Sequence, residues 1–290
     1  MTAIAPATAP ATTTEEAGTE GRSALSWAVR DTLVVARRNL IRYTRVPQLL
    51  VFTFIQPVMF VLLFRYVFGG SIKTPGVAYV DYLMPGIFVQ TVVFGSVSTG
   101  IGLAEDMQTG LVDRFRSLPM SRMAVLGGRT LADLVRNTFV VLLMLVIGVA
   151  VGFRPHGGVP GIVLACGLVL AASFALSWVF ALVGMRSGNA EAAQAISFPV
   201  LFPLTFASSA FAPVSNMPGW LQVFAAHQPI TLIIDAARGL MLGGHDAATL
   251  RHFRLLGGTT GSNLGWAVFS IALTLAVFMP LAVNRYRKAV

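Results

Sequence analysis

Residues 137–185 read NTFVVLLMLVIGVAVGFRPHGGVPGIVLACGLVLAASFALSWVFALVGM and contain one charged side chain, Arg154. About 20 apolar residues are enough for an α-helix to cross a bilayer. This stretch therefore predicts two membrane-spanning helices joined by a turn at Arg154. Four further charge-free runs lie at 46–64, 82–104, 192–234 and 255–284. The pattern predicts an all-α polytopic membrane protein with six transmembrane helices.

Composition supports a membrane protein and argues against a water-soluble one. Hydrophobic residues make up 55% of the chain, charged residues only 11%, and the mean hydropathy is +0.74. A soluble domain of 290 residues could not bury that much apolar surface. The net charge of +9 comes from basic residues that flank the apolar runs. We therefore expect contact with anionic membrane lipids and no nucleic-acid partner.

The distribution of Lys and Arg predicts the orientation in the membrane. With six spans and a cytoplasmic N-terminus, the inner segments hold 15 of the 21 Lys and Arg residues, so both termini are predicted to be cytoplasmic. A seventh span at 220–240 would give the same distribution. That segment is too polar to cross, however, because it contains Gln222, His227, Asp235 and Arg238. We expect 212–240 to form a re-entrant helical hairpin in the outer leaflet.

The chain before the first span has two parts. Residues 1–24 are rich in Ala, Thr and Pro and lack the apolar stretch of a signal peptide, which predicts a disordered cytoplasmic tail. Apolar residues then recur at helical spacing opposite a row of arginines, so 25–46 are predicted to form an amphipathic helix in the membrane interface. A charged lead-in to the first span is the alternative. The transmembrane domain is expected to cover 47–290.

The segment 104–130, AEDMQTGLVDRFRSLPMSRMAVLGGRT, is longer than a membrane connection requires. The excess of positive charge on the inner side could alone explain its arginines. The mixture of acids, arginines, glycine and proline is better explained by a docking surface for a soluble partner, with a short coupling helix near 106–118. The residues expected to hold that contact are Glu105, Asp106, Gly110, Arg114, Arg116, Pro119 and Arg129.

Polar and aromatic residues inside the apolar runs are the candidates for a substrate path. Serine and threonine in membrane helices often bond their own backbone instead, and small residues there commonly serve helix packing. No acidic residue is expected in the middle of the membrane, and the lone Cys166 and the four histidines lack metal-ligand or catalytic spacing. The path candidates are Gln56, Gln90, Gln194, Thr205, Phe206 and Ser209.

At these segments the chain resembles the permease subunits of bacterial ATP-binding-cassette exporters, of the type named for daunorubicin resistance and lipid export. The resemblance covers nearly the whole chain after residue 24. It rests on Arg45-Val46-Pro47 before the first span and on an acid followed by Gly110, Arg114-Phe-Arg116, Pro119 and Gly128-Arg129. It also rests on Pro218-Gly219-Trp220, Pro229-Ile230-Thr231 and Asp235-Ala-Ala-Arg238 in the outer segment.

The resemblance implies an exporter in the bacterial plasma membrane that moves a hydrophobic drug-like molecule or a lipid outward. It implies two copies of a separate ATPase subunit that bind ATP and Mg²⁺, and a second permease, identical or related. The chain itself has no phosphate-binding loop, because the motif needs a glycine directly before its lysine, whereas Ile72 precedes Lys73 and Arg287 precedes Lys288. No cofactor or catalytic residue is therefore expected in this chain.

Two other classes of protein remain to be weighed. A secondary transporter should show a carboxylate inside a span and often an inverted repeat, and a membrane-embedded enzyme should show a nucleophile with its base or a metal cluster. The sequence shows no obvious case of either.

In the outer segment, Asp235 and Arg238 are three residues apart, so they can pair on one helical face. We expect this pair, with Pro218-Gly219-Trp220 as the turn of the hairpin, to hold a lid over the exit of the path; a solvated surface pair is the alternative.

Overall fold

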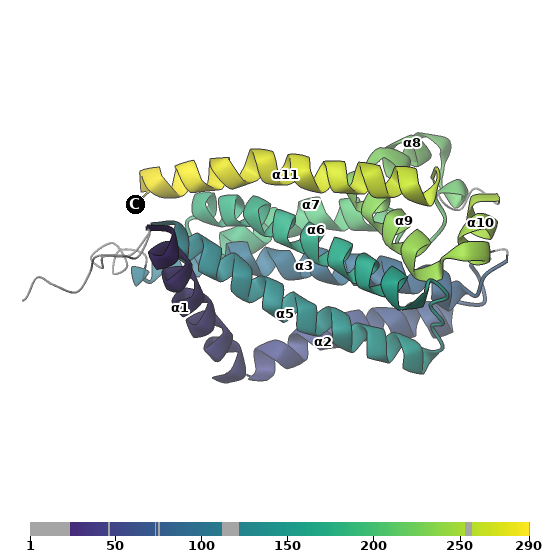
Figure 1. Cartoon of the computed structure of the whole chain (residues 1–290), viewed down its shortest axis with the longest axis horizontal. Coiled ribbons are helices and arrows are strands. Elements are labelled where there is room, and N and C mark those ends of the chain that lie inside the picture. Colours follow the sequence, from purple (N-terminus) through teal and green to yellow (C-terminus); the bar gives the residue numbers. More distant parts are fainter. Residues whose placement is uncertain are drawn as a thin grey trace, which may run out of the picture.

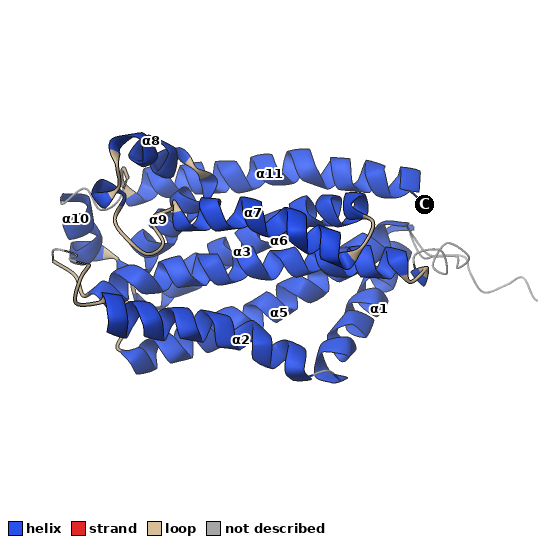
Figure 2. Ribbon diagram, turned by 180° about the vertical axis from the view of Figure 1, so that it is seen from behind, coloured by secondary structure: helices blue, strands red, loops and turns tan. Residues whose placement is uncertain are grey.

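The computed structural model describes residues 24–45, 47–72, 74, 76–111, 122–252 and 257–289. Within these ranges all regular secondary structure is helical, and no strand occurs (Figures 1 and 2). The helices are α1 (Ala24–Arg45), α2 (Pro47–Leu62), η1 (Leu63–Phe68), α3 (Tyr79–Gln108), α5 (Arg122–Val151), α6 (Gly158–Ser187), α7 (Ala190–Phe206), η2 (Val214–Asn216), α8 (Gly219–His227), α9 (Pro229–Leu242), α10 (Gly244–His252) and α11 (Thr260–Ala289).

Four of these helices are long and apolar enough to cross a membrane, over Tyr79–Gln108, Ala124–Val151, Gly158–Ser187 and Thr260–Tyr286. They correspond to the second, third, fourth and sixth predicted spans. The helices at the first and fifth are shorter: α2 has 16 residues and runs directly into the π-helical η1, and α7 has only 17 residues. Two prolines inside α7, Pro199 and Pro203, remove backbone donors from it.

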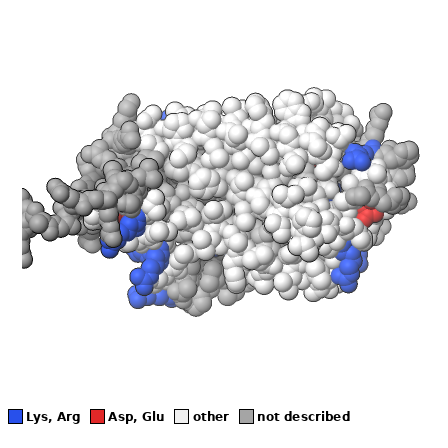
Figure 3. Space-filling model, viewed as in Figure 1, with Lys and Arg blue, Asp and Glu red and all other residues white. Residues whose placement is uncertain are grey.

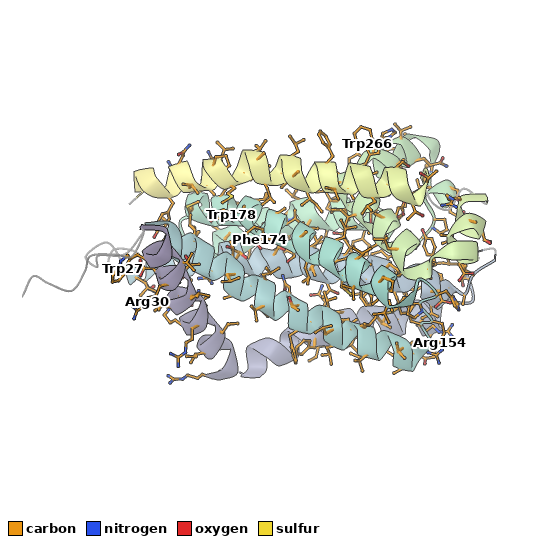
Figure 4. The ribbon with its side chains drawn as sticks, in the orientation of Figure 1. Trp27, Arg30, Arg154, Phe174, Trp178 and Trp266 are labelled. Atoms are coloured by element: carbon orange, nitrogen blue, oxygen red, sulfur yellow. The ribbon has the colours of Figure 1, made fainter. Side chains whose placement is uncertain are left out.

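The surface agrees with a membrane environment. In Figure 3 the visible basic and acidic side chains lie near the two ends of the long axis, and the middle of that face carries none. Figure 4 places Trp27 and Arg30 at one end and Arg154 at the other, while Trp266 points outward from α11 and is 60% exposed. Figure 1 also shows that α1 begins at the same end of the bundle at which α11 finishes.

Helix α3 forms the centre of the bundle and packs against α5, α6, α7 and α9. Every residue from Tyr79 to Val93 is buried. Helices α3 and α6 approach closely because glycines meet at their crossing: a Cβ at Gly184 would overlap the carbonyl oxygen of Gly100. Such small-residue contacts let membrane helices bring their backbones together.

Helix α1 lies against α5. Its contact side contains the buried Val35 and Ala36, and a Cβ at Gly128 of α5 would press on Val35. Trp27, Val29 and other large apolar residues of α1 are exposed instead. The helix therefore presents apolar surface away from the bundle, as an interfacial helix would.

The structure corrects the expected extent of the third membrane helix. Helix α5 begins at Arg122, so residues 122–130 of the segment 104–130 are helical, and Asp133 lies inside a candidate span. The sequence placed Asp133 in the connection before the third span, and the structure places it within α5 instead. Asp133 is tolerated there because Arg136, one turn along the same helix, pairs with it and Thr99 of α3 donates a hydrogen bond to it.

The outer segment forms two helices, but its bend differs from the expected one. Pro218-Gly219-Trp220 begins α8, and the bend between α8 and α9 lies at Gln228. Pro229 then occupies the first position of α9, where its missing N–H costs nothing. Helix α8 lies at the periphery, with Trp220 76% exposed, whereas α9 packs among α3, α6 and α11.

Candidate functional site

A cavity of about 440 Å³ lies between α2, α3, α5 and α7. It brings together three glutamines from the predicted substrate path, Gln56 of α2, Gln90 of α3 and Gln194 of α7. Its walls combine these amides with phenylalanines and one arginine. The lining residues are Gln56, Pro57, Phe60, Gln90, Thr91, Phe94, Gly95, Ser98, Ile101, Arg136, Gln194 and Phe198.

The polar groups of this cavity differ in how they are satisfied. Gln56 and Gln194 are exposed, but Gln90 is only 3% exposed, and neither Nε2 nor Oε1 finds a hydrogen-bond partner among the described residues. The hydroxyls of Thr91 and Ser98 donate to carbonyls of their own helix, at 2.7 and 2.6 Å. Gln90 is therefore a buried group of the cavity whose donor and acceptor are both unused.

Arg136 of α5 lines the cavity, and its guanidinium is bound by groups of α3 and α5. Its Nη2 donates to the carbonyl oxygen of Gly95 at 2.6 Å, and its Nη1 lies 3.4 Å from Oδ1 of Asp133. Asn137 then donates to Oγ of Ser173 on α6 at 2.6 Å. These contacts join α3, α5 and α6 beside the cavity, and sequence reasoning missed them because Asp133 and Arg136 were assigned to a connection.

A second charged cluster lies on the same helices toward the end that carries α1. Asp106 of α3 is buried and accepts a hydrogen bond from Nη1 of Arg129 on α5. Nη2 of Arg38 on α1 lies 3.8 Å from Oδ2 of Asp106. The cluster ties together three helices next to the predicted docking segment. Glu105 is half-buried in α3, and Gly110 follows that helix with a φ of +69°. Arg114, Arg116 and Pro119 lie outside the described residues.

Phenylalanine rings form a continuous array that leads away from the cavity. Phe94 and Phe198 line the cavity, and Phe202 lies 5.3 and 5.7 Å from their ring centres. Phe206 follows at 5.8 Å, and Phe211 lies 5.0 Å beyond it. Phe64 and Phe68 continue the array along η1 at centroid distances of 4.3 and 5.2 Å. The predicted path residue Phe206 therefore lies in this array, outside the lining of the cavity.

The other two predicted path residues, Thr205 and Ser209, are fully buried and do not line the cavity. Ser209 instead belongs to a charged cluster around α9. Its hydroxyl donates to Oδ1 of Asp235 at 2.7 Å, and Nη1 of Arg238 lies 2.9 Å from the same oxygen. The predicted pair thus exists, but it is buried, with the Arg238 side chain at 0% exposure.

Arg238 also fastens α9 to the central helix. Its Nε donates to the carbonyl oxygen of Tyr82 at 2.9 Å, its Nη2 donates to the carbonyl oxygen of Ser209 at 2.8 Å, and its guanidinium carbon lies 3.7 Å from the centre of the Tyr82 ring. Cation–π contact adds to these hydrogen bonds.

Among the described residues no group of three or more metal-ligating side chains occurs.

With long apolar helices around a cavity of amides and aromatic rings, this chain has the architecture expected of a membrane transport protein. More particularly, it belongs to the ABC-2 type transporter family, whose model matches residues 30–242. The chain is the permease subunit of an ABC transporter.

The chain matches curated permease proteins over most of their length. A daunorubicin resistance ABC transporter permease protein from Streptomyces coeruleorubidus is 33% identical over 92% of this chain and 89% of its own. A probable doxorubicin resistance ABC transporter permease protein from Mycobacterium tuberculosis is 27% identical over 90% of both chains. A putative transport permease from Cyanophora paradoxa is 27% identical over 73% of this chain and 74% of its own.

Proposed function

We propose that this permease exports a hydrophobic aromatic drug across the plasma membrane of a bacterium, and that the cavity between α2, α3, α5 and α7 is where the drug binds. The observation that carries the proposal is the cavity itself. Its volume of about 440 Å³ falls in the range of sites for drug-sized ligands, and its aromatic walls with a few convergent polar groups have the composition of such sites. The names of the relatives support the same class of cargo.

The phenylalanine array supplies the onward route. It begins at Phe94 and Phe198 in the cavity wall and continues through Phe202 and Phe206 toward η1. A flat aromatic molecule can exchange one stacked ring for the next without becoming solvated. Phe202 and Phe206 are each 42% exposed, so the route runs along the outside of this chain. A second permease, identical or related, would close it.

The energy comes from a separate ATPase subunit, in two copies, that binds ATP and Mg²⁺ and docks on the segment 104–130. Asp106 and Arg129 belong to that segment and are buried, and with the half-exposed Arg38 they would transmit its movement to α1, α3 and α5. Further along α5, Asp133 accepts a hydrogen bond from Thr99 of α3, and Arg136 donates one to the carbonyl oxygen of Gly95. Arg136 also lines the cavity. A shift of α5 along α3 would therefore alter the cavity.

The proposed topology has six spans, with α2 and η1 as the first and α7 as the fifth. The predominance of basic residues in the inner segments supports cytoplasmic termini, and α1 and the end of α11 lie at the same end of the bundle. Helices α8 and α9 would form the re-entrant hairpin on the outer side. Its inner helix, α9, is too deeply packed against α3, α6 and α11 to open as a separate lid.

The function can be tested in inverted membrane vesicles that contain the permease and its ATPase partner. We expect ATP-dependent accumulation of daunorubicin, followed by its fluorescence. No accumulation is expected with a hydrolysis-deficient ATPase or with ATP omitted. Movement of a fluorescent phospholipid under the same conditions, with daunorubicin unmoved, would contradict the proposed cargo and identify a lipid exporter.

A further inference from the structure

The amide of Gln90 is placed where an apolar side chain would ordinarily be expected. It lies in the tightly packed part of α3, next to the buried Val89 and Val92, and is itself 3% exposed. Buried polar atoms almost always have hydrogen-bond partners, because leaving one without a partner costs free energy. Both polar atoms of Gln90 lack a partner within the described part of the chain, so this position has a cost that packing does not explain.

The surroundings of Gln90 determine what could satisfy it. Thr91 and Ser98 already donate their hydroxyl protons to backbone carbonyls, and Arg136 is held by Gly95 and Asp133. The remaining lining is mostly apolar, with three phenylalanines, Pro57 and Ile101, and its other polar groups are the exposed amides of Gln56 and Gln194. A molecule that fills this space must therefore be apolar and aromatic over most of its surface, with a polar group at the level of Gln90.

We propose that Gln90 is a specificity-determining residue of the transporter. It selects aromatic ligands that carry a neutral group able to accept a hydrogen bond from Nε2 and, best of all, to donate one to Oε1. A carboxamide, or a carbonyl beside a hydroxyl, has this chemistry. A purely hydrocarbon aromatic of the same size leaves the amide unsatisfied and is disfavoured. This inference rests on the proposed function, because it assigns the cavity to the cargo.

Three naphthalenes of similar size separate the two hydrogen bonds. The carboxamide 2-naphthamide can accept and donate, 2-acetylnaphthalene can only accept, and 2-isopropylnaphthalene can do neither. Binding is measured by fluorescence with purified permease in lipid nanodiscs, for the wild type and for Gln90→Leu. The quantity compared is the ratio of the two dissociation constants for each probe, since each probe's own partitioning into lipid cancels in that ratio.

A neutral hydrogen bond contributes about fivefold to binding, so we expect Gln90→Leu to weaken 2-acetylnaphthalene about fivefold and 2-naphthamide roughly tenfold or more. The affinity for 2-isopropylnaphthalene should stay the same or rise. Gln222→Leu is the matched control, because that amide lies on α8, outside the cavity, and already donates to the carbonyl oxygen of Met217 at 2.7 Å. All three ratios should be close to one for this variant.

Equal ratios for the three probes in Gln90→Leu would overturn the proposal, as would failure of the wild type to bind any of them. If Gln90→Leu does not fold, Gln90→Asn replaces it; a graded loss across the probes supports the assignment, and a uniform ratio rejects it. The drug-export assay is read separately. Export without graded ratios rejects the role of Gln90 alone, whereas graded ratios without export reject the proposed function and leave the binding site standing.

Discussion

Arg238 is the largest fully buried side chain among the described residues, and it shows how single residues hold this protein together. A buried guanidinium is tolerated only when its charge and its donors are satisfied. Asp235 supplies the charge, the carbonyl oxygens of Tyr82 and Ser209 accept its protons, and the Tyr82 ring covers it. The sequence predicted the spacing of the pair, but it gave no indication of Tyr82, which lies 156 residues away.

This cluster predicts a large loss of stability for either single substitution. Asp235→Ala or Arg238→Ala leaves a buried charge without its partner and should lower the free energy of unfolding by roughly 3–5 kcal/mol. The double variant should cost clearly less than the sum of the two, because the interaction is lost only once. Unfolding is measured by denaturant titration in detergent micelles.

The pair between His156 and Asp246 is the matched control, because its atoms lie 2.6 Å apart but the His156 side chain is 60% exposed. Asp246→Ala should cost less than about 1 kcal/mol, as exposed pairs usually do. If Asp235→Ala also lowers the free energy of unfolding by less than about 1 kcal/mol, the buried Asp235–Arg238 pair does not stabilise the protein more than an exposed pair does.

At the scale of elements, the contact between α3 and α6 depends on glycine on both sides. A Cβ at Gly184 would overlap the backbone oxygen of Gly100, and backbone cannot rotate away as a side chain can. Gly167 lies on the same helix, and nothing lies within 4 Å of a Cβ placed there. The two positions therefore separate the effect of helix packing from the intrinsic helix preference of glycine.

We predict opposite effects for alanine at these two positions. Gly167→Ala should raise the free energy of unfolding by up to about 1 kcal/mol, because alanine is the better helix former. Gly184→Ala should lower it by about 1–3 kcal/mol, the usual cost of overpacking. Thermal unfolding of the purified variants in detergent gives the comparison, and equal behaviour of the two would rule out a close crossing of α3 and α6.

The phenylalanine array also belongs to the scale of elements, because α7 supplies its central rings at every fourth residue, Phe198, Phe202 and Phe206. Phe202→Ala should reduce the rate of drug export several-fold, since it interrupts the stacked route, and should leave the ATPase bound. Phe269→Ala on α11 is the control, because Phe269 is 56% exposed but lies away from the array. Export is followed in inverted vesicles at matched expression; equal rates in the two variants would remove the array from the route.

The spacing of residues in the sequence could have predicted two of these features, the earlier start of α5 and the phenylalanine array of α7. Arg129, Asp133 and Arg136 are four and three residues apart, which places them on one helical face. That spacing indicated that α5 extends back at least to Arg129, but the rule that positive charges favour the cytoplasm led us to predict a connection there instead. The four-residue spacing of the phenylalanines was likewise a signal, and lipid-facing aromatics give the same pattern.

On the scale of the whole molecule, the charge-free runs were enough to predict an all-helical membrane protein, because a bilayer requires that each apolar run close its hydrogen bonds within a helix. They could not predict which helices meet. Three of the predicted path residues, Gln56, Gln90 and Gln194, converge on the cavity from three helices, whereas Thr205 and Ser209 pack in the core. Only the arrangement of the bundle separates the two groups.

Protection of Gln194 tests most directly whether the cavity is where the drug binds. The chain has one cysteine, Cys166, so Cys166→Ala gives a background into which Gln194→Cys or Arg186→Cys can be introduced. Gln194 lines the cavity, while Arg186 is exposed at the end of α6 and does not line it. In the permease–ATPase complex, daunorubicin should slow maleimide labelling at position 194 several-fold and leave position 186 unchanged. Equal labelling of position 194 with and without a drug that the complex demonstrably exports would contradict the proposed site.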